Sequence, residues 1–106
     1  MGLLNDLFNL SDKRKLKEKV QTGALFVDVR SWEEYYAGHV AGSINIPLYL
    51  IPVEMEKFSK ETPIVVVCES GARSGQAVHF LKSKGFEAYN GGGWRSFSTN
   101  HTKLNQ

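Results

Sequence analysis

The stretch IVVVCESGARS, residues 64–74, joins the most apolar run of the chain to a short loop of small residues. Residues 64–67 are β-branched and do not alternate with polar residues, which is typical of a strand buried on both faces of a parallel sheet. Ala77, Phe80 and Leu81 then recur at helical spacing, and Gly85 ends that pattern. The stretch therefore predicts a buried strand that leads through a tight loop into a helix over about residues 74–84.

Strand and helix patterns alternate along the rest of the chain. Ser11 is the expected N-cap of the first helix, and Ser31 with Glu34 forms a capping-box pattern that opens the second, which ends near Gly38. The other predicted strands are residues 25–29, 43–46 and 87–90, the second stopped by Pro47 and the third by the glycines 91–93; the other predicted helices are residues 11–22, 31–38 and 53–59. This order predicts an α/β sandwich, with helices on both faces of a mainly parallel sheet.

The length and composition fit one domain. The chain has 106 residues, of which 42% are hydrophobic, and a single cysteine, Cys68. One cysteine excludes an intramolecular disulfide and a multi-cysteine metal site. We expect residues 1–10 to be a lead-in, residues 11–97 to form the domain, and the polar residues 98–106 to be a frayed tail.

Charge and hydropathy give no sign of a nucleic-acid or membrane partner. The formal net charge is +2, and the basic excess is concentrated in residues 13–19, which we interpret as a solvated helix face. No apolar window is long enough to span a membrane, and Asn5 and Asp6 interrupt the segment where a secretory signal would be apolar. We therefore expect a cytoplasmic protein.

The loop after the central strand is suited to hold a thiolate. In an open α/β sheet, ligands bind beyond the carboxyl ends of the strands, which is where Cys68 lies. Loop amides, the start of the following helix and the guanidinium of Arg73 would each stabilise negative charge on the sulfur, whereas Glu69 opposes it. We expect a depressed pKa for Cys68 and, without a second cysteine, the chemistry of a single nucleophile.

Four motifs in order resemble those of rhodanese-like sulfurtransferases. The loop itself is similar to the active-site loop of that family, and Asp28-Val29-Arg30 ends the first predicted strand. EYYAGHVAGSINIP, residues 34–47, is similar to the family stretch E-x3-G-H-x2-G-A-x-N-I-P, with Ser43 where alanine is usual. GGGW, residues 91–94, resembles the family's glycine-rich turn. The resemblance covers about residues 11–97 and implies a three-layer sandwich with a sheet of about five strands.

The resemblance also implies an activity, thiosulfate sulfurtransferase. The Cys68 thiolate would take a sulfane sulfur from a small sulfur-containing anion such as thiosulfate, or from a protein persulfide, and pass it to a thiol or cyanide; no cofactor is implied. The expected anion-binding loop consists of Glu69, Ser70, Gly71, Ala72 and Arg73. In the family the residue after the cysteine is frequently arginine, so Glu69 predicts that thiosulfate is a poor donor and a neutral or protein-borne persulfide a better one.

Two other classes remain as alternatives. A non-catalytic persulfide-binding or protein-interaction module is one, although such modules usually lack the cysteine. A phosphatase-like or arsenate-reducing enzyme is less favoured, because those relatives carry Cys-x5-Arg, whereas Cys68 and Arg73 form Cys-x4-Arg with a narrower loop.

Several residues around the loop have a supporting role in this prediction. Asp28 and Arg30 are interpreted mainly as a structural ion pair that supports the site, and Trp94 as a residue that could line its mouth. Ser74 follows the loop and is grouped with them. His39 is interpreted as structural, because attack by a thiolate needs no general base.

Overall fold

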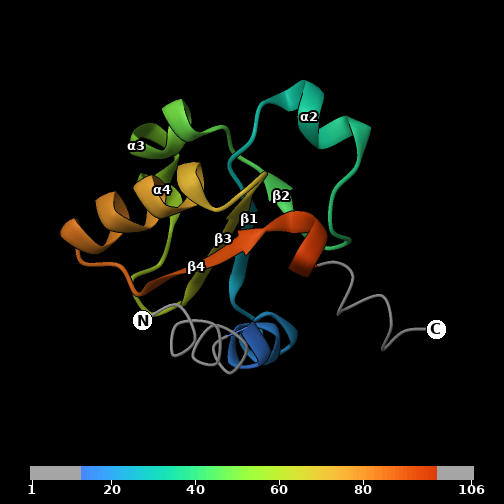
Figure 1. Cartoon of the computed structure of the whole chain (residues 1–106). Helices are drawn as coiled ribbons and strands as arrows, with labels where there is room; N and C mark the ends of the chain where they lie inside the picture. The colour runs from blue at the N-terminus through green and yellow to red at the C-terminus, as the bar shows by residue number, and fades with distance from the viewer. Residues whose placement is uncertain (1–12, 98–106) are drawn as a thin grey trace, which may run out of the picture.

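The computed structural model describes residues 13–97, which alternate between strands and helices (Figure 1). The strands are β1 (Leu25–Asp28), β2 (Ile44–Asn45), β3 (Ile64–Cys68) and β4 (Ala88–Gly93). The helices are α2 (Trp32–Ala37), α3 (Ile51–Glu54) and α4 (Ala72–Ser83), with short 3-10 turns η1 (Leu48–Leu50) and η2 (Met55–Lys57). Residues 13–21, here called the N-terminal helix, and residues 94–97 are also helical.

The four strands of the described residues form one parallel sheet in the order β2-β1-β3-β4. Leu25 pairs with Ile64, and Ile64 pairs with Ala88, so the strands start level and their carboxyl ends meet at one edge. The parallel α/β sheet is confirmed, although it has one strand fewer than the expected five. The turn from β3 into α4 lies at this carboxyl edge, and α2 lies near it (Figure 1).

Side chains of β3 alternate between two apolar cores, one on each face of the sheet. Ile64 and Val66 pack with residues of α3 and α4, whereas Val65 and Val67 pack with Leu16 of the N-terminal helix and with Phe97. Every residue of β3 is buried. Burying an aliphatic side chain of this size contributes about 1.5–3 kcal/mol, so β3 is the strand that anchors both layers.

The observed helices differ from the sequence prediction mainly at their ends. The capping box of α2 is formed as predicted, with Ser31 accepting from the Glu34 amide and Glu34 accepting from the Ser31 amide. The helix expected over residues 53–59 begins earlier, through η1 and α3, and ends at Lys57. The predicted N-cap Ser11, the lead-in and the tail lie outside the described residues.

The prediction that glycines 91–93 end the last strand is wrong, because β4 runs through Gly93. A Cβ atom on Gly93 would lie 2.8 Å from the carbonyl oxygen of Glu69, and real Cβ atoms do not approach that closely. The register also shifts between Val66 and Val67, where β4 has one extra residue. Glycine therefore allows the strand to pass beside the loop, a close backbone approach that overrides its low strand propensity.

The basic stretch over residues 13–19 was predicted to be a solvated helix face, and Lys17 departs from that prediction. Lys17 is buried, and its ammonium lies 5.6 Å from the centre of the Phe97 ring. Burial, with a contribution from nearby Lys13, lowers the pKa of Lys17. No helix in residues 13–97 is long and apolar enough to cross a membrane.

Candidate active site

The Cys68 sulfur lies at the end of β3, beneath the turn that leads into α4. The residue is almost fully buried, and the Gly71 amide donates a hydrogen bond to its Sγ over 2.9 Å. Gly71 has φ +100°, a left-handed conformation that costs little only for glycine. This residue is also the N-cap of α4 and has no side chain to cap the helix, so the first amides of α4 are available to the sulfur.

The surroundings lower the pKa of the Cys68 thiol. Burial acts in the opposite direction, because a thiolate is poorly solvated there, but hydrogen bonds outweigh it. The Ser74 hydroxyl contributes most, followed by the amides of Ser74, Gly71 and Ser70. The direction of this shift agrees with the sequence prediction, and its source is the loop and the first turn of α4.

Ser74 and Asn90 form a polar network behind the sulfur. The buried Ser74 hydroxyl lies 3.3 Å from Sγ and 2.7 Å from Asn90 Oδ1. Asn90 also accepts from the Gly92 amide and donates to the Gly71 carbonyl. A serine hydroxyl has one proton, so it donates either to Asn90 or to a thiolate. Because Gly92 still donates to Asn90 Oδ1, Ser74 can turn its proton to the sulfur without leaving that oxygen unpaired.

Sequence reasoning gave Asn90 no role in the site. Its available signal was its place as the last residue of the predicted strand 87–90, at the carboxyl edge where ligands bind in such sheets. Its contacts come from segments about 16 to 19 residues apart, and periodicity does not reveal them.

Arg73 is bound to a carboxylate at the mouth of the loop. Its guanidinium donates to both oxygens of Glu34 over 2.8 and 3.0 Å, and both side chains are more than one-third exposed. Hydrogen bonds from Arg73 and Ser31 hold the pKa of Glu34 at about 2. The hydrogen bond to Glu34 is the largest cause of the raised pKa of the Arg73 guanidinium, and negative charge on Cys68 also contributes. The arginine is therefore near the site, but its charge is balanced by Glu34.

Glu69 points out to solvent and is also paired. Its carboxylate accepts from Arg95 and, over 3.2 Å, from Trp94 Nε1. Hydrogen bonds from Arg95 and then Trp94 lower the pKa of Glu69, so it stays ionised at neutral pH. The exposed position means that water screens much of its effect on Cys68.

Asp28 and Arg30 form a buried ion pair at the end of β1, with a shortest distance of 2.8 Å. Arg30 also donates to the carbonyls of Glu34 and Gly38, and its guanidinium lies 4.6 Å from the centre of the Trp94 ring. The pair thereby ties the sheet to the two ends of the segment that carries Glu34. This geometry fits the structural interpretation with indirect support of the site.

The contacts that His39 makes within residues 13–97 are with Tyr35 and not with the Cys68 sulfur. Its Nδ1 lies 2.8 Å from the Tyr35 carbonyl, and its ring stacks on the Tyr35 ring. These contacts fit the structural role. Within residues 13–97, no group of histidine, cysteine and acidic side chains could hold a metal ion.

Known proteins resemble this chain in sequence and in fold. The Rhodanese-like domain family model matches residues 12–100. A sulfurtransferase of Allochromatium vinosum is 32% identical over 82 residues, which cover 76% of this chain and 77% of that protein. The thiosulfate sulfurtransferase GlpE of Tolumonas auensis is 33% identical over 73 residues, 64% of this chain and 69% of that protein.

Solved structures show the same fold. The rhodanese-like domain protein of Staphylococcus aureus superposes with a TM-score of 0.70 at 32% identity, covering 80% of this chain and 86% of that one. The family model's match over residues 12–100 includes the loop, β4 and the paired residues around them. The chain belongs to the rhodanese-like domain family.

Proposed function

We propose that this protein is a sulfurtransferase that carries a sulfane sulfur on Cys68. The observation that carries this proposal is the Gly71 amide on Sγ, together with the pKa of Cys68 lowered by the loop and Ser74. A thiolate at neutral pH is the reactive form of cysteine. Relatives named as sulfurtransferases give further support.

The first half-reaction loads Cys68. The thiolate attacks the outer sulfur of a donor, a new S–S bond forms, and the donor's own S–S bond breaks. The electron pair of that bond leaves with the donor, as sulfite from thiosulfate or as a thiolate from a persulfide. The amides of Ser70, Gly71 and Ser74 that stabilise the thiolate are also placed to stabilise charge on the persulfide.

The second half-reaction returns the enzyme to its resting state. A nucleophilic acceptor attacks the outer sulfur and takes it, and the electron pair of the Cys68 S–S bond returns to Sγ as a thiolate. Cyanide would become thiocyanate, and a thiolate would become a persulfide. Because the chain has one cysteine, no second thiol of the same chain can form a disulfide with Cys68 and release the outer sulfur as hydrosulfide.

Charges at the mouth favour a thiol-derived persulfide over thiosulfate as donor. Arg73 is neutralised by Glu34, and Arg95 is neutralised by Glu69. The two exposed arginines are thus balanced by two carboxylates, which leaves no net positive charge from these pairs to attract dianionic thiosulfate. A persulfide carries one negative charge at most and is repelled less by the carboxylates. The proposal places substrate binding in the loop from Glu69 to Arg73.

Mass spectrometry of the intact protein tests the function. After treatment with thiosulfate or polysulfide, we expect a gain of one sulfur atom at Cys68, reversed by cyanide. Cys68→Ser is the matched control and should gain none. If the native protein gains no sulfur from any donor, the catalytic proposal fails and a non-catalytic interaction module takes its place.

A further inference from the structure

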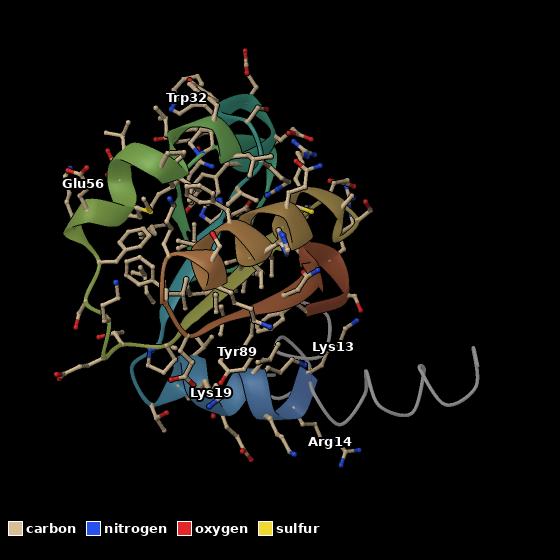
Figure 2. All side chains as sticks on the ribbon, turned by 90° about the vertical axis from the view of Figure 1, so that its left-hand side faces the viewer. Lys13, Arg14, Lys19, Trp32, Glu56 and Tyr89 are labelled. Carbon is tan, nitrogen blue, oxygen red and sulfur yellow. The ribbon has the colours of Figure 1, made fainter. Side chains whose placement is uncertain are left out.

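A groove of about 720 Å³ runs along the outer side of β4 and ends at the active-site loop. The N-terminal helix forms one wall and α4 the other, with β4 between them (Figure 2). Ser70, Gly71, Gly92 and Gly93 line the groove where it meets the loop. Since the Gly71 amide also holds the Cys68 sulfur, a molecule in the groove touches the outside of the turn that contains the reactive atom.

Lysines come from both walls of the groove. Lys13, Lys15 and Lys19 belong to the N-terminal helix and Lys82 to α4. No acidic residue is among the residues that line the groove, and within residues 13–97 neither Lys15 nor Lys82 makes an ion pair. Lys19 lies 3.7 Å from the Glu87 carboxylate, so the cationic character of the groove comes mainly from Lys13, Lys15 and Lys82. At the mouth, by contrast, carboxylates balance the arginines.

The lysines are spread along the groove and do not converge on one point. Lys13 and Lys19 are six residues apart on the helix, a rise of about 9 Å, and Figure 2 shows them at different ends of it. Lys13 donates to Ser96, and Lys19 lies 5.0 Å from the centre of the Tyr89 ring. This spacing suits several negative charges along a chain better than one phosphate group.

Apolar side chains lie between these charges. Leu16, Val78 and Ala88 form an apolar floor, but all three are buried, so a ligand meets little apolar surface there and the lysines dominate its contacts. A peptide cannot add to β4 as a fifth strand along this segment, because Ala88 is fully buried and the Asn90 side chain occupies the Gly92 amide. A peptide in this groove would therefore be recognised by the side chains that line it and not by backbone pairing with β4.

Nucleic acid fits this surface less well. Tyr89 is the aromatic residue in the groove, and the Lys19 ammonium lies over its ring, where a base would stack. The whole-chain charge of +2 is also small for a protein that tracks a phosphate backbone.

We propose that this groove, formed by the N-terminal helix, β4 and α4, binds an acidic polypeptide segment of the protein that exchanges sulfur with Cys68. The inference rests on the proposed function, because it assigns the partner of the same site. Charge complementarity provides the attraction, and continuity with residues 70 and 71 brings the bound partner to the sulfur.

Fluorescence anisotropy with the full chain tests the proposal. The probe is a fluorescein-labelled peptide, Glu-Leu-Glu-Glu-Leu-Glu-Gly-Gly, and its control replaces every glutamate with glutamine. We expect saturable binding of the acidic peptide that weakens as salt is added, and much weaker binding of the glutamine peptide. Equal binding of the two peptides, or no binding, overturns the proposal.

Charge-reversal variants locate the site. The variant K15E/K82E changes one lysine on each wall and should raise the dissociation constant about tenfold, since each reversal replaces an attraction with a repulsion. The matched control R14E/K84E has the same charge change outside the groove, and Figure 2 shows Arg14 pointing away from it. Equal weakening by the two variants contradicts the groove, as does displacement of the peptide by single-stranded RNA of equal charge at a lower concentration.

The two proposals fail in different ways. Peptide binding needs no sulfur transfer, so Cys68→Ser should bind the acidic peptide like the native protein. Conversely, K15E/K82E should still gain sulfur at Cys68 from a small persulfide donor. Binding without any gain of sulfur contradicts only the catalytic proposal, and gain of sulfur without binding contradicts only the groove.

Discussion

Removing the Ser74 hydroxyl should raise the pKa of Cys68 by about one unit. A hydrogen bond to a charged group contributes about 1.5–3 kcal/mol, and the amides of Ser74, Gly71 and Ser70 remain in Ser74→Ala to compensate in part. The lower end of that range is a little over 1.36 kcal/mol, which corresponds to one pKa unit. Asn90 keeps the Gly92 amide as a donor, so the substitution leaves its Oδ1 paired.

The pH dependence of alkylation by iodoacetamide measures this shift. Well below the pKa, a rise of one unit lowers the thiolate fraction about tenfold, while the more basic thiolate is intrinsically about threefold more nucleophilic. The alkylation rate should therefore fall about threefold at low pH and rise about threefold at high pH, so that the two profiles cross. Ultraviolet absorbance of the thiolate gives the pKa independently.

Ser70→Ala is the matched control for Ser74→Ala. It also removes a serine hydroxyl close to Cys68, but Ser70 lies in the loop, is exposed and acts on the sulfur through its amide, which the substitution keeps. Its profile should coincide with that of the native protein. An unchanged or lower pKa in Ser74→Ala would refute the assignment of this hydroxyl as the main stabiliser of the thiolate.

Four other single substitutions test the mouth of the loop and the approach of β4. Glu69→Arg adds positive charge at the mouth and should raise the specificity constant for thiosulfate about threefold or more in a sulfite-release assay; no change or a loss contradicts our view of Glu69. Arg73→Ala leaves Glu34 unpaired and should raise the KM for thiosulfate, with E34Q/R73A restoring part of it, whereas full activity in Arg73→Ala would exclude the guanidinium from the site. The Glu34 carboxylate has a depressed pKa of about 2, so its contribution to stability is fully present above about pH 4.5 and is lost as the pH falls towards 2; urea unfolding of native protein and Glu34→Gln should show a difference that shrinks over that range. Gly93→Ala places a Cβ against the Glu69 carbonyl and should lower the unfolding free energy by about 1–3 kcal/mol in the same assay, whereas an unchanged unfolding free energy would contradict the close approach.

The parts of the fold that follow from local pattern were predictable from the sequence. The unbroken β-branched run of β3 indicated burial on both faces, and the serine and glutamate of the α2 capping box indicated where that helix begins. The extent of β4 was not predictable in this way, because three successive glycines weaken a strand in isolation. Tertiary contacts give glycine an advantage there: a Cβ on Gly93 would meet Glu69, one on Gly91 would meet Val67, and Gly92 has φ +81°.

In the candidate site, too, the features that depend on contiguous sequence were predictable and the contacts between distant segments were not. Cys68 and the amides of its loop follow from a strand, a tight turn and a helix that are contiguous in sequence. The partners of Arg73 and Ser74 come from other segments, Glu34 being 39 residues before Arg73 and Asn90 16 residues after Ser74. Such pairs depend on how the segments between the strands pack. The sequence showed which residues could form hydrogen bonds or ion pairs, but not which of them would be partners.

The distribution of charge separates the chemistry at the sulfur from the recruitment of a partner. Near Cys68 the exposed arginines are paired with Glu34 and Glu69, so the groups that stabilise the thiolate are amide dipoles and a hydroxyl. Dipoles act strongly at hydrogen-bond distance but weakly on an anion that is still in solution. Long-range attraction therefore has to come from unpaired charges, and Lys15 and Lys82, which make no ion pair within residues 13–97, supply them along the groove. On this argument, added salt should slow sulfur exchange with an acidic protein partner much more than exchange with an uncharged small persulfide. Equal salt dependence for the two would show that the groove takes no part in recruitment.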